Sequence, residues 1–306
     1  MGTPAFAVPS LNALIEAGHE ILAVVTRPDK PRGRGREPSP SAVKAAATPR
    51  GIPVLTPANI REEGFTKLLK DMAPEFIVVV AYGRILPESV LNIPPGGCVN
   101  LHASLLPSYR GAAPVNWAII NGDRETGVST MFMDAGLDTG PVLLEKKVAI
   151  GDDDTAEDLA VSLSNEGAAL LKETIALLSE GRLKPRPQDN SKATFAPVLK
   201  KEDGRIDWMK GSEEIRNLIR GLYPWPGACT RWKGLLKIHS ALAHTGPGVN
   251  AVASPGTVIG VKGGTIDVAC GEGMLRITEL QPENKRRMSA AEFISGYRIG
   301  KGERFI

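Results

Sequence analysis

The sequence predicts an α/β protein with a Rossmann-like, mostly parallel sheet, followed by a small OB-like β-barrel domain. Over residues 1–182, β-branched apolar runs alternate with amphipathic segments, which is typical of strands joined by helices in a parallel sheet. Beyond a proline-rich stretch, short apolar runs follow one another between glycine-rich turns, which is typical of a small barrel. Of the 306 residues, 42% are hydrophobic, enough for each part to form its own core.

The elements of the first part follow from the period of their apolar residues. The unbroken apolar run 76–81 indicates a strand buried on both faces, as parallel strands usually are. Alternation after it indicates a further strand that begins at Cys98. The other expected strands are 21–26, 53–55, 126–133 and 141–150, and the expected helices are 5–17, 42–50, 62–72, 114–121 and 155–179.

The chain opens on the turn Met1-Gly2-Thr3-Pro4, with no strand ahead of the first helix. In a doubly wound sheet, the strand before that helix is the central one. Without it, two neighbouring strands lose a partner and part of the core is exposed. We therefore expect residues upstream of Met1 in the native chain; if Met1 is the true start, either another segment fills this position or the stability is poor.

The stretch 27–44 has no hydrophobic periodicity and is rich in proline, glycine and arginine. It holds six basic residues, Arg32, Arg34 and Arg36 among them, against two acidic ones. A flexible cationic segment is suited to phosphate backbones, although solvated loops have the same composition. A structureless insertion of this length inside a compact domain is more often functional than incidental.

The second part begins after a linker. Residues 183–199 contain three prolines and no periodic pattern, so we place domains at 1–182 and 200–306. Residues 200–306 have 17 Lys/Arg and 11 Asp/Glu, a net charge of +6, against −3 for residues 1–199. This asymmetry indicates an anionic partner or ordinary surface scatter. The expected elements are strands 230–232, 236–241, 256–261, 265–269 and 274–280 and a helix over 289–295.

Several function classes are disfavoured. The three cysteines lack metal or disulfide spacing, which predicts no metal site and a reducing, cytoplasmic compartment. The longest apolar run, 76–81, is far too short to cross a membrane. The chain also lacks a dinucleotide glycine fingerprint and a phosphate-binding P-loop.

The candidate catalytic stretch lies at the end of the strand that begins at Cys98. Asn100 and His102 are two residues apart, so their side chains point to the same side. An amide donor and an imidazole can stabilise a developing oxyanion and move a proton. Both residues also have ordinary structural roles in caps and cores. Asp138, in the glycine-rich turn 134–140, would join them only if the fold brings it to His102.

The sequence resembles the methionyl-tRNA formyltransferase family along nearly its whole length. Each matching motif is weak alone, but their ordered set is highly specific. The matching motifs are 2–9, 26–31, 78–86, 100–107, 110–114, 134–140, 204–208 and 224–227.

The resemblance implies transfer of the formyl group of 10-formyltetrahydrofolate to the amino group of initiator methionyl-tRNA, without a metal. Its fold would be of the formyltransferase type, and the protein is expected to be a cytoplasmic monomer with no membrane contact. The implied catalytic residues are Asn100, His102 and Asp138. The implied folate-binding residues are Ser104, Leu105, Leu106, Pro107, Tyr82, Gly83, Ile85 and Leu86. The implied tRNA-binding residues are Arg32, Arg34, Arg36, Lys200 and Lys201.

Three other readings remain open at this point. Formyltransferases that act on glycinamide ribonucleotide or on amino sugars of nucleotides share the Asn, His and Asp set. A non-catalytic RNA-binding protein could also combine a Rossmann-like domain with an OB-like barrel. The basic insertion favours tRNA over the first two, and retention of Asn100, His102 and Asp138 argues against the third.

Overall fold

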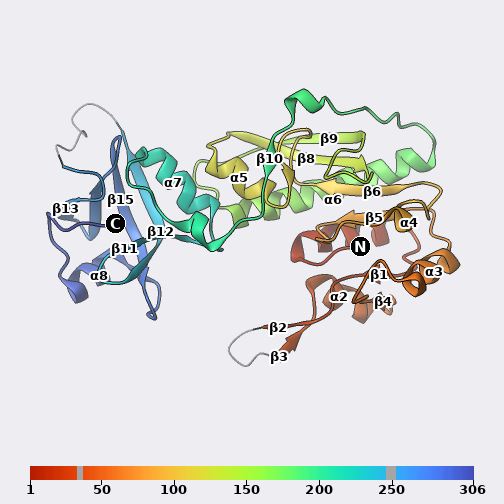
Figure 1. The fold of residues 1–306 in the computed structure, drawn as a ribbon, viewed down its shortest axis with the longest axis horizontal. Coiled ribbons are helices and arrows are strands. Elements are labelled where there is room, and N and C mark those ends of the chain that lie inside the picture. Colours follow the sequence, from red (N-terminus) through yellow and green to blue (C-terminus); the bar gives the residue numbers. More distant parts are fainter. Residues whose placement is uncertain (33–36, 246–252) are drawn as a thin grey trace. The chain divides into compact units, whose positions relative to one another are not determined.

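The computed structural model describes residues 1–32, 37–245 and 253–306, and Figure 1 shows the course of the chain. The described chain divides into two compact units. The first consists of Met1–Pro114, Glu125–Ala149 and Ala160–Pro197, and the second of Val115–Arg124, Ile150–Leu159 and Val198–Ile306.

The first unit contains the expected Rossmann-like sheet, with one half parallel and the other antiparallel. β5 (Ile77–Val80) pairs in parallel with β6 (Cys98–His102). β8 (Glu125–Phe132) and β9 (Val142–Ala149) then extend the sheet in antiparallel register, in the order β5-β6-β8-β9. Every residue of β6 is buried, and in β5, which the apolar run 76–81 predicts, three of the four residues are buried.

Met1 and Gly2 link this sheet to a second parallel pair, β1 (Val24–Val25) with β4 (Val54–Leu55). The Gly2 N–H donates to the Val25 carbonyl at 2.9 Å, and the Val80 N–H donates to the Met1 carbonyl at 2.9 Å. The first two residues therefore occupy the sheet position between β1 and β5. β1 is much shorter than the predicted strand 21–26, because only Val24 and Val25 pair with β4.

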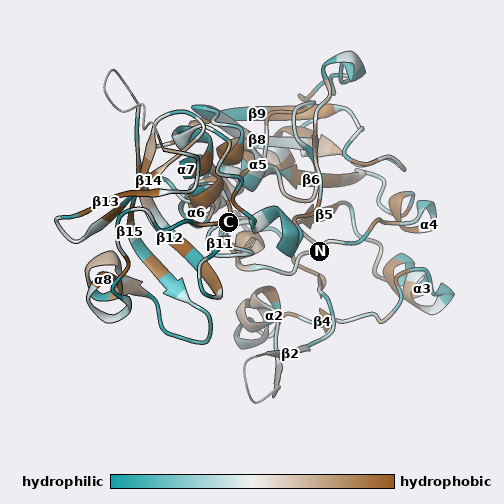
Figure 2. Ribbon diagram, turned by 60° about the vertical axis from the view of Figure 1, so that its left-hand side comes forward, coloured by the Kyte–Doolittle hydropathy of each residue, from teal (hydrophilic) through white to brown (hydrophobic). Residues whose placement is uncertain are grey.

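Helices cover these strands at nearly the predicted places. Phe65 and Leu69 of α3 pack with Ile77 and Val79 of β5 in one buried cluster, and Figure 2 shows the alternating hydrophilic and hydrophobic stripes of α3. The helices are α1 (Val8–Glu16), α2 (Ala42–Ala47), α3 (Glu63–Met72), α4 (Glu88–Leu91), α5 (Pro114–Ile120) and α6 (Ala156–Ser179), with 3₁₀ turns η1 (Ala5–Ala7) and η2 (Thr48–Arg50). The predicted helix 5–17 therefore starts as a 3₁₀ turn.

Two stretches that the sequence presents as structureless contain regular structure. In the basic insertion, β2 (Lys30–Arg32) pairs antiparallel with β3 (Glu37–Ser39), so the expectation of an unstructured segment is wrong there. In the expected linker, η3 (Asn190–Lys192) precedes β10 (Phe195–Ala196), which pairs with β7 (Arg110–Gly111). Such short pairings rest on backbone hydrogen bonds and leave no hydrophobic period to detect.

The second unit has an antiparallel sheet in the order β11-β12-β15-β14-β13, with β16 beside β15. Its buried core includes Trp208, Leu275, Ile277 and Phe293. α7 is absent from the sequence prediction because charged residues dominate its composition. The elements are η4 (Lys201–Gly204), α7 (Ser212–Gly221), β11 (Ala228–Arg231), β12 (Leu235–His244), β13 (Val258–Lys262), β14 (Thr265–Ala269), β15 (Met274–Pro282), β16 (Met288–Ser289) and α8 (Ala290–Tyr297).

The end of the chain contacts both edge strands of this second sheet. The Arg231 N–H of β11 donates to the Ile306 carbonyl at 2.8 Å, and the Phe305 N–H donates to the Gly256 carbonyl, next to β13, at 2.8 Å. Within the described ranges, no helix combines the length and the apolar character needed to span a bilayer.

Candidate active site

The site is built at the carboxyl end of β6. Asn100 and His102 alternate along this strand and are 8% and 6% exposed. β5 pairs with β6 on one side and β8 on the other, where His102 is opposite Ser129. Pairing on both sides fixes the backbone of the strand, and this backbone fixes where the two polar side chains emerge.

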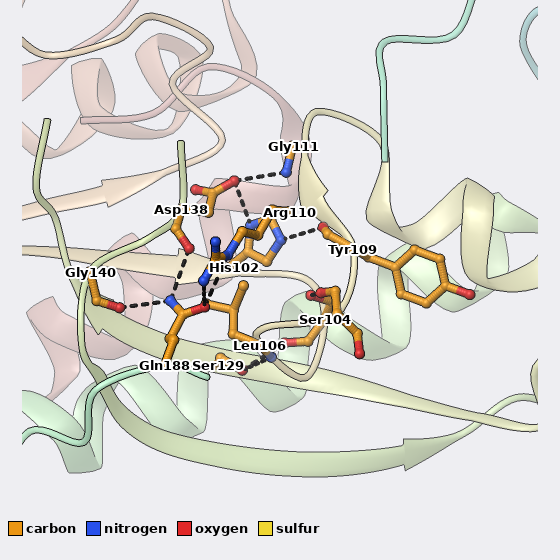
Figure 3. A network of polar contacts seen from close by, with 11 residues as sticks. His102, Ser104, Leu106, Tyr109, Arg110, Gly111, Ser129, Asp138, Gly140 and Gln188 are labelled. Carbon is orange, nitrogen blue, oxygen red and sulfur yellow. Dashed lines mark hydrogen bonds and ion pairs between the residues drawn. The ribbon is translucent and has the colours of Figure 1, made fainter. Parts of the chain in front are cut away.

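The loop between β8 and β9 brings Asp138 to His102, as Figure 3 shows. The Asp138 Oδ2 atom lies 3.7 Å from His102 Nδ1, within ion-pair range but longer than a good hydrogen bond. The same carboxylate oxygen accepts the backbone N–H of Gly111 at 2.9 Å. The imidazole and the carboxylate therefore lie together although they come from two separate segments, and the condition that the sequence analysis set for Asp138 is met.

The other ring nitrogen of His102 also faces an acceptor. His102 Nε2 lies 2.9 Å from the carbonyl oxygen of Tyr109, which can only accept a hydrogen bond. Nε2 is therefore the donor in this contact, while Nδ1 faces the Asp138 carboxylate. The ring is held between these two groups on the same strand as Asn100.

A set of residues that the sequence analysis did not assign to the site holds the loop of Asp138. Gln188 Nε2 donates to the carbonyls of Asp138 at 2.9 Å and Gly140 at 2.7 Å. Buried Arg110 in turn donates to Gln188 Oε1 at 2.7 Å and to Asn190 Oδ1 at 2.7 Å. Arg110 belongs to a motif of the sequence, whereas Gln188 lies in the expected linker and no pattern marked it.

The backbone of Asp138 explains why such support is needed. Its φ of 53° lies in the left-handed region, which is unfavourable for a residue with a Cβ atom. Strain of this kind costs roughly 1–3 kcal/mol and persists only where surrounding contacts hold it. The two hydrogen bonds from Gln188 are such contacts, and they aim the carboxylate toward His102.

The segment 104–107, which the resemblance assigns to folate binding, is a loop held by buried hydrogen bonds. Ser104 is fully buried, and its hydroxyl donates to the Ser108 carbonyl at 2.6 Å. Ser129 of β8 donates to the Ser104 carbonyl at 2.7 Å and accepts from the Leu106 N–H at 3.1 Å. The Ser104 side chain thus shapes the loop from inside, and half-buried Leu105 and Pro107 are the members exposed enough to contact a ligand.

The second assigned folate segment, 82–86, contains both buried and exposed members. Tyr82 and Leu86 are buried, at 1% and 3% exposure, and burial raises the pKa of the Tyr82 hydroxyl. The Arg27 guanidinium donates to the Gly83 carbonyl and holds the turn. Ile85 is 65% exposed, so its apolar side chain is available to cover a ring of a ligand.

The residues assigned to tRNA are only partly described. Lys200 and Lys201 are exposed at the start of η4, where the Lys200 N–H donates to Asp203. Arg32 is the last residue of β2. Arg34 and Arg36 lie outside the described residues. The described part of the chain has no cluster of three His, Cys, Asp or Glu residues that could hold a metal ion.

Two family models match the chain, and both define the same class of protein. The model described as formyl transferase matches residues 1–175, and the model described as formyl transferase, C-terminal domain, matches residues 198–298. The chain therefore belongs to the formyl transferases.

Curated relatives narrow the class to one family. The chain is 50% identical over 303 residues to the methionyl-tRNA formyltransferase of Pelobacter propionicus, with 99% of this chain and 93% of the relative covered. It is 51% identical over 306 residues to that of Caldanaerobacter subterraneus subsp. tengcongensis, covering 99% and 97%. The chain belongs to the methionyl-tRNA formyltransferase family.

Solved structures share the fold at lower identity. A sugar 3N-formyl transferase solved in the presence of dTDP and 5-N-formyl-THF has a TM-score of 0.67 and 22% identity, over 93% of this chain and 97% of that one. The N-formyltransferase of Helicobacter canadensis, solved with folinic acid and dTDP-3-aminofucose, has a TM-score of 0.66 and 21% identity, over 94% and 97%.

Proposed function

We propose that this protein is an enzyme that transfers the formyl group of 10-formyltetrahydrofolate to the α-amino group of initiator methionyl-tRNA. The product is formylmethionyl-tRNA for translation initiation. The observation that supports this most is the meeting of His102 and Asp138, 3.7 Å apart, beside Asn100 in a chain of this family. The full-length similarity to methionyl-tRNA formyltransferases supports the choice of acceptor.

In the reaction, the methionyl amine attacks the formyl carbon and forms a tetrahedral intermediate with a negative oxygen. Asn100 donates from its amide to that oxygen, and His102 does so with the Nε2–H that it otherwise directs to the Tyr109 carbonyl, while Asp138 orients the ring. The new C–N bond remains, the bond from the formyl carbon to N10 of the folate breaks, and N10 takes up the proton that the amine gives up. The amine is the direct nucleophile, so no covalent enzyme intermediate forms.

The folate co-substrate is proposed to lie against the two loops next to β6. Exposed Ile85 and half-buried Leu105 and Pro107 supply apolar contact, and Tyr82, Gly83, Leu86, Ser104 and Leu106 shape the loops. Structural neighbours were solved with tetrahydrofolic acid or formyl derivatives of it, which supports the class of ligand. The proposed reaction needs no metal, because amide and imidazole donors stabilise the oxyanion.

The tRNA is proposed to contact the basic insertion at Arg32, Arg34 and Arg36 and the exposed pair Lys200 and Lys201. We propose 1–182 as the catalytic domain, 183–199 as the linker and 200–306 as an OB-like tRNA-binding domain. The net charge of +6 on that last domain supports this assignment. Its sheet would close as a barrel through the terminal segment, which bonds to both edge strands. We further propose a cytoplasmic monomer.

A three-acceptor assay tests the proposed function. The protein is incubated with 10-formyltetrahydrofolate labelled in the formyl group and with charged initiator tRNA, glycinamide ribonucleotide or a nucleotide-linked amino sugar. We expect label on methionyl-tRNA alone. Label on either small acceptor, or on none of the three, would contradict the proposal.

A further inference from the structure

Residues 176–197 lie between the ranges that the two family models match, and part of this segment borders the candidate active site. Gln188 bonds to the loop of Asp138, and further along the segment β10 pairs in parallel with β7. The exposed side chains of β10 are therefore candidates for contact with a substrate.

The backbone around β10 is fixed against the loop that follows β6. The Thr194 carbonyl accepts the Arg110 N–H at 2.9 Å, and the Thr194 hydroxyl accepts the Tyr109 N–H at 2.8 Å. One residue past Phe195, the Ala196 carbonyl accepts the Ala112 N–H at 2.9 Å. Bonds on both sides of Phe195 thus hold its backbone in place before any ligand binds.

The register of this strand pair brings Phe195 close to the candidate catalytic carboxylate. Phe195 is opposite Arg110, and the next residue, Gly111, donates its N–H to Asp138 Oδ2 at 2.9 Å, as Figure 3 shows. A Cβ atom at Gly111 would meet the Ala196 carbonyl oxygen at 2.6 Å, so the close approach of the strands requires glycine there. Since paired strands lie about 4.8 Å apart, the Phe195 Cα atom is within roughly 10 Å of the Asp138 carboxylate.

Phe195 is the exposed member of β10. Its side chain is 66% exposed, whereas Ala196 is buried. A single exposed apolar side chain needs no explanation by itself. This one, however, stands on a strand that is fixed beside the catalytic carboxylate, so its flat aromatic face is preorganised for the ring of a ligand.

The chemistry of the acceptor indicates which ring this face would meet. In an aminoacyl-tRNA, the ester and the ribose connect the α-amine to the terminal adenine, and this connection spans roughly 8 Å when extended. With the amine placed at the site beside Asp138, the adenine reaches the distance at which Phe195 lies. Every base has a π-face, and single-stranded ends of RNA are commonly held by stacking on aromatic side chains.

Two other occupants fit this ring less well. The methionine side chain is flexible and apolar, and a pocket that encloses it would recognise it better than a ring that is 66% exposed. The folate is proposed to lie against the loops 82–86 and 104–107, where Ile85 and Leu105 already supply apolar contact.

We propose that Phe195 is the stacking platform for the terminal adenine of the aminoacyl-tRNA, and that this contact positions the amine at the formyl carbon. The inference rests on the proposed function, because it takes methionyl-tRNA as the acceptor. It makes transfer depend on the base at the 3′ end of the tRNA and not on the methionyl group alone.

The test compares initiator tRNA that ends in adenosine with the same tRNA that ends in an abasic ribose, both charged with methionine. In the wild-type chain, removal of the base should lower kcat/KM by about 5–100-fold, the usual range for one stacked base. Phe195→Ala should show a similar loss with the adenosine-ended tRNA and at most about a twofold further loss with the abasic one. Phe195→Trp should keep the preference for adenosine, whereas Phe195→Leu, which is apolar without a ring, should lose it.

Val161→Ala is the matched control, because Val161 is also an exposed apolar residue of the first unit, at 60% exposure. It should leave the preference for adenosine and kcat/KM unchanged. A preference for adenosine that persists in Phe195→Ala, or equal losses in Phe195→Ala and Val161→Ala, would overturn the proposal. Weaker folate binding by Phe195→Ala would also overturn it, because the ring would then contact the folate.

The same data separate this inference from the function on which it rests. Wild-type transfer to methionyl-tRNA without coupling between Phe195 and the terminal base overturns the inference alone. Absence of wild-type transfer to methionyl-tRNA overturns the proposed function as well.

Discussion

Two strand positions in the first unit differ in how completely their neighbours enclose them. β6 pairs with β5 and β8 over its length, and all five of its residues are buried. Met1 and Gly2 lie between β1 and β5 in the same way, but a cavity of about 550 Å³ continues beyond them. The candidate catalytic groups therefore lie on a strand that its neighbours enclose, whereas Met1 and Gly2 border a cavity.

This comparison separates two kinds of experiment. Changes on β6 and in the loop of Asp138 should alter turnover with little effect on unfolding. Changes at Met1 should alter unfolding with little effect on the chemical step.

Asn100→Ala is expected to give the largest effect on turnover. Loss of one oxyanion donor typically lowers kcat by about 10²–10³-fold. Folate affinity, measured by fluorescence titration, should change by less than about threefold if the amide acts mainly in the transition state. Near-normal kcat in this variant would remove Asn100 from the catalytic set.

Asp138→Asn should lower kcat by roughly 10–100-fold, because the ring of His102 loses its charged neighbour. The Asn side chain can still accept the Gly111 N–H, so the loop should keep its shape. Asp134→Asn is the matched control, since Asp134 lies in the same loop and bonds only within it, to Gly136 and Thr139. Equal losses in both variants would indicate a loop effect instead of a role for the carboxylate at His102.

The pH dependence of the free energy of unfolding tests the burial of the Met1 amine. The amine has an ordinary pKa of 8.0 and a pKa of about 5 in the folded chain. Between these values the unfolded chain binds a proton that the folded chain does not, so the free energy of unfolding rises with pH over this window. The rise is expected to reach at most about 4 kcal/mol from pH 5 to pH 8.

Acetylation of the Met1 amine supplies the control for that measurement. The acetylated chain contains every other titrating group, so the difference between the two chains isolates the amine. Parallel stability curves for both chains in urea would show that the amine remains charged in the fold, contrary to the prediction.

Gln188→Ala is expected to have the smallest effect, roughly a 3–10-fold lower kcat with KM nearly unchanged, because Gln188 touches the Asp138 loop and not the reacting atoms. Ser191→Ala, which removes a bond within an exposed turn of the same segment, should leave kcat unchanged. The pH profile of kcat should shift in Gln188→Ala alone. If Gln188→Ala leaves both kcat and its pH profile unchanged, Gln188 does not position the catalytic loop.

The sequence could predict the elements whose apolar residues repeat. β5 falls at the expected position because a buried strand of a parallel sheet has a continuous apolar run, and β6 does so because Val99 and Leu101 alternate with polar residues. β2 and β3 could not be predicted, because a hairpin of charged residues and prolines is held by backbone bonds alone. α7 was missed because charged residues conceal its apolar stripe of Ile215 and Ile219.

The site was predictable in its residue types and not in its geometry. Spacing alone shows that Asn100 and His102 share a face, since the period of a strand is two. It cannot show that Asp138 reaches His102, because that depends on the loop conformation held by Gln188 from a distant part of the chain. The fully buried state of Ser104 was likewise set by Ser129 on a neighbouring strand.

Rapid-quench transfer of a labelled formyl group by the wild-type chain and by His102→Ala tests the central claim most directly. The wild-type chain should label methionyl-tRNA in one step, with no labelled protein at any time. His102→Ala should bind folate with an unchanged Kd and transfer the group at least about 100-fold more slowly. A labelled protein intermediate, or transfer by His102→Ala at close to the wild-type rate, would contradict the account.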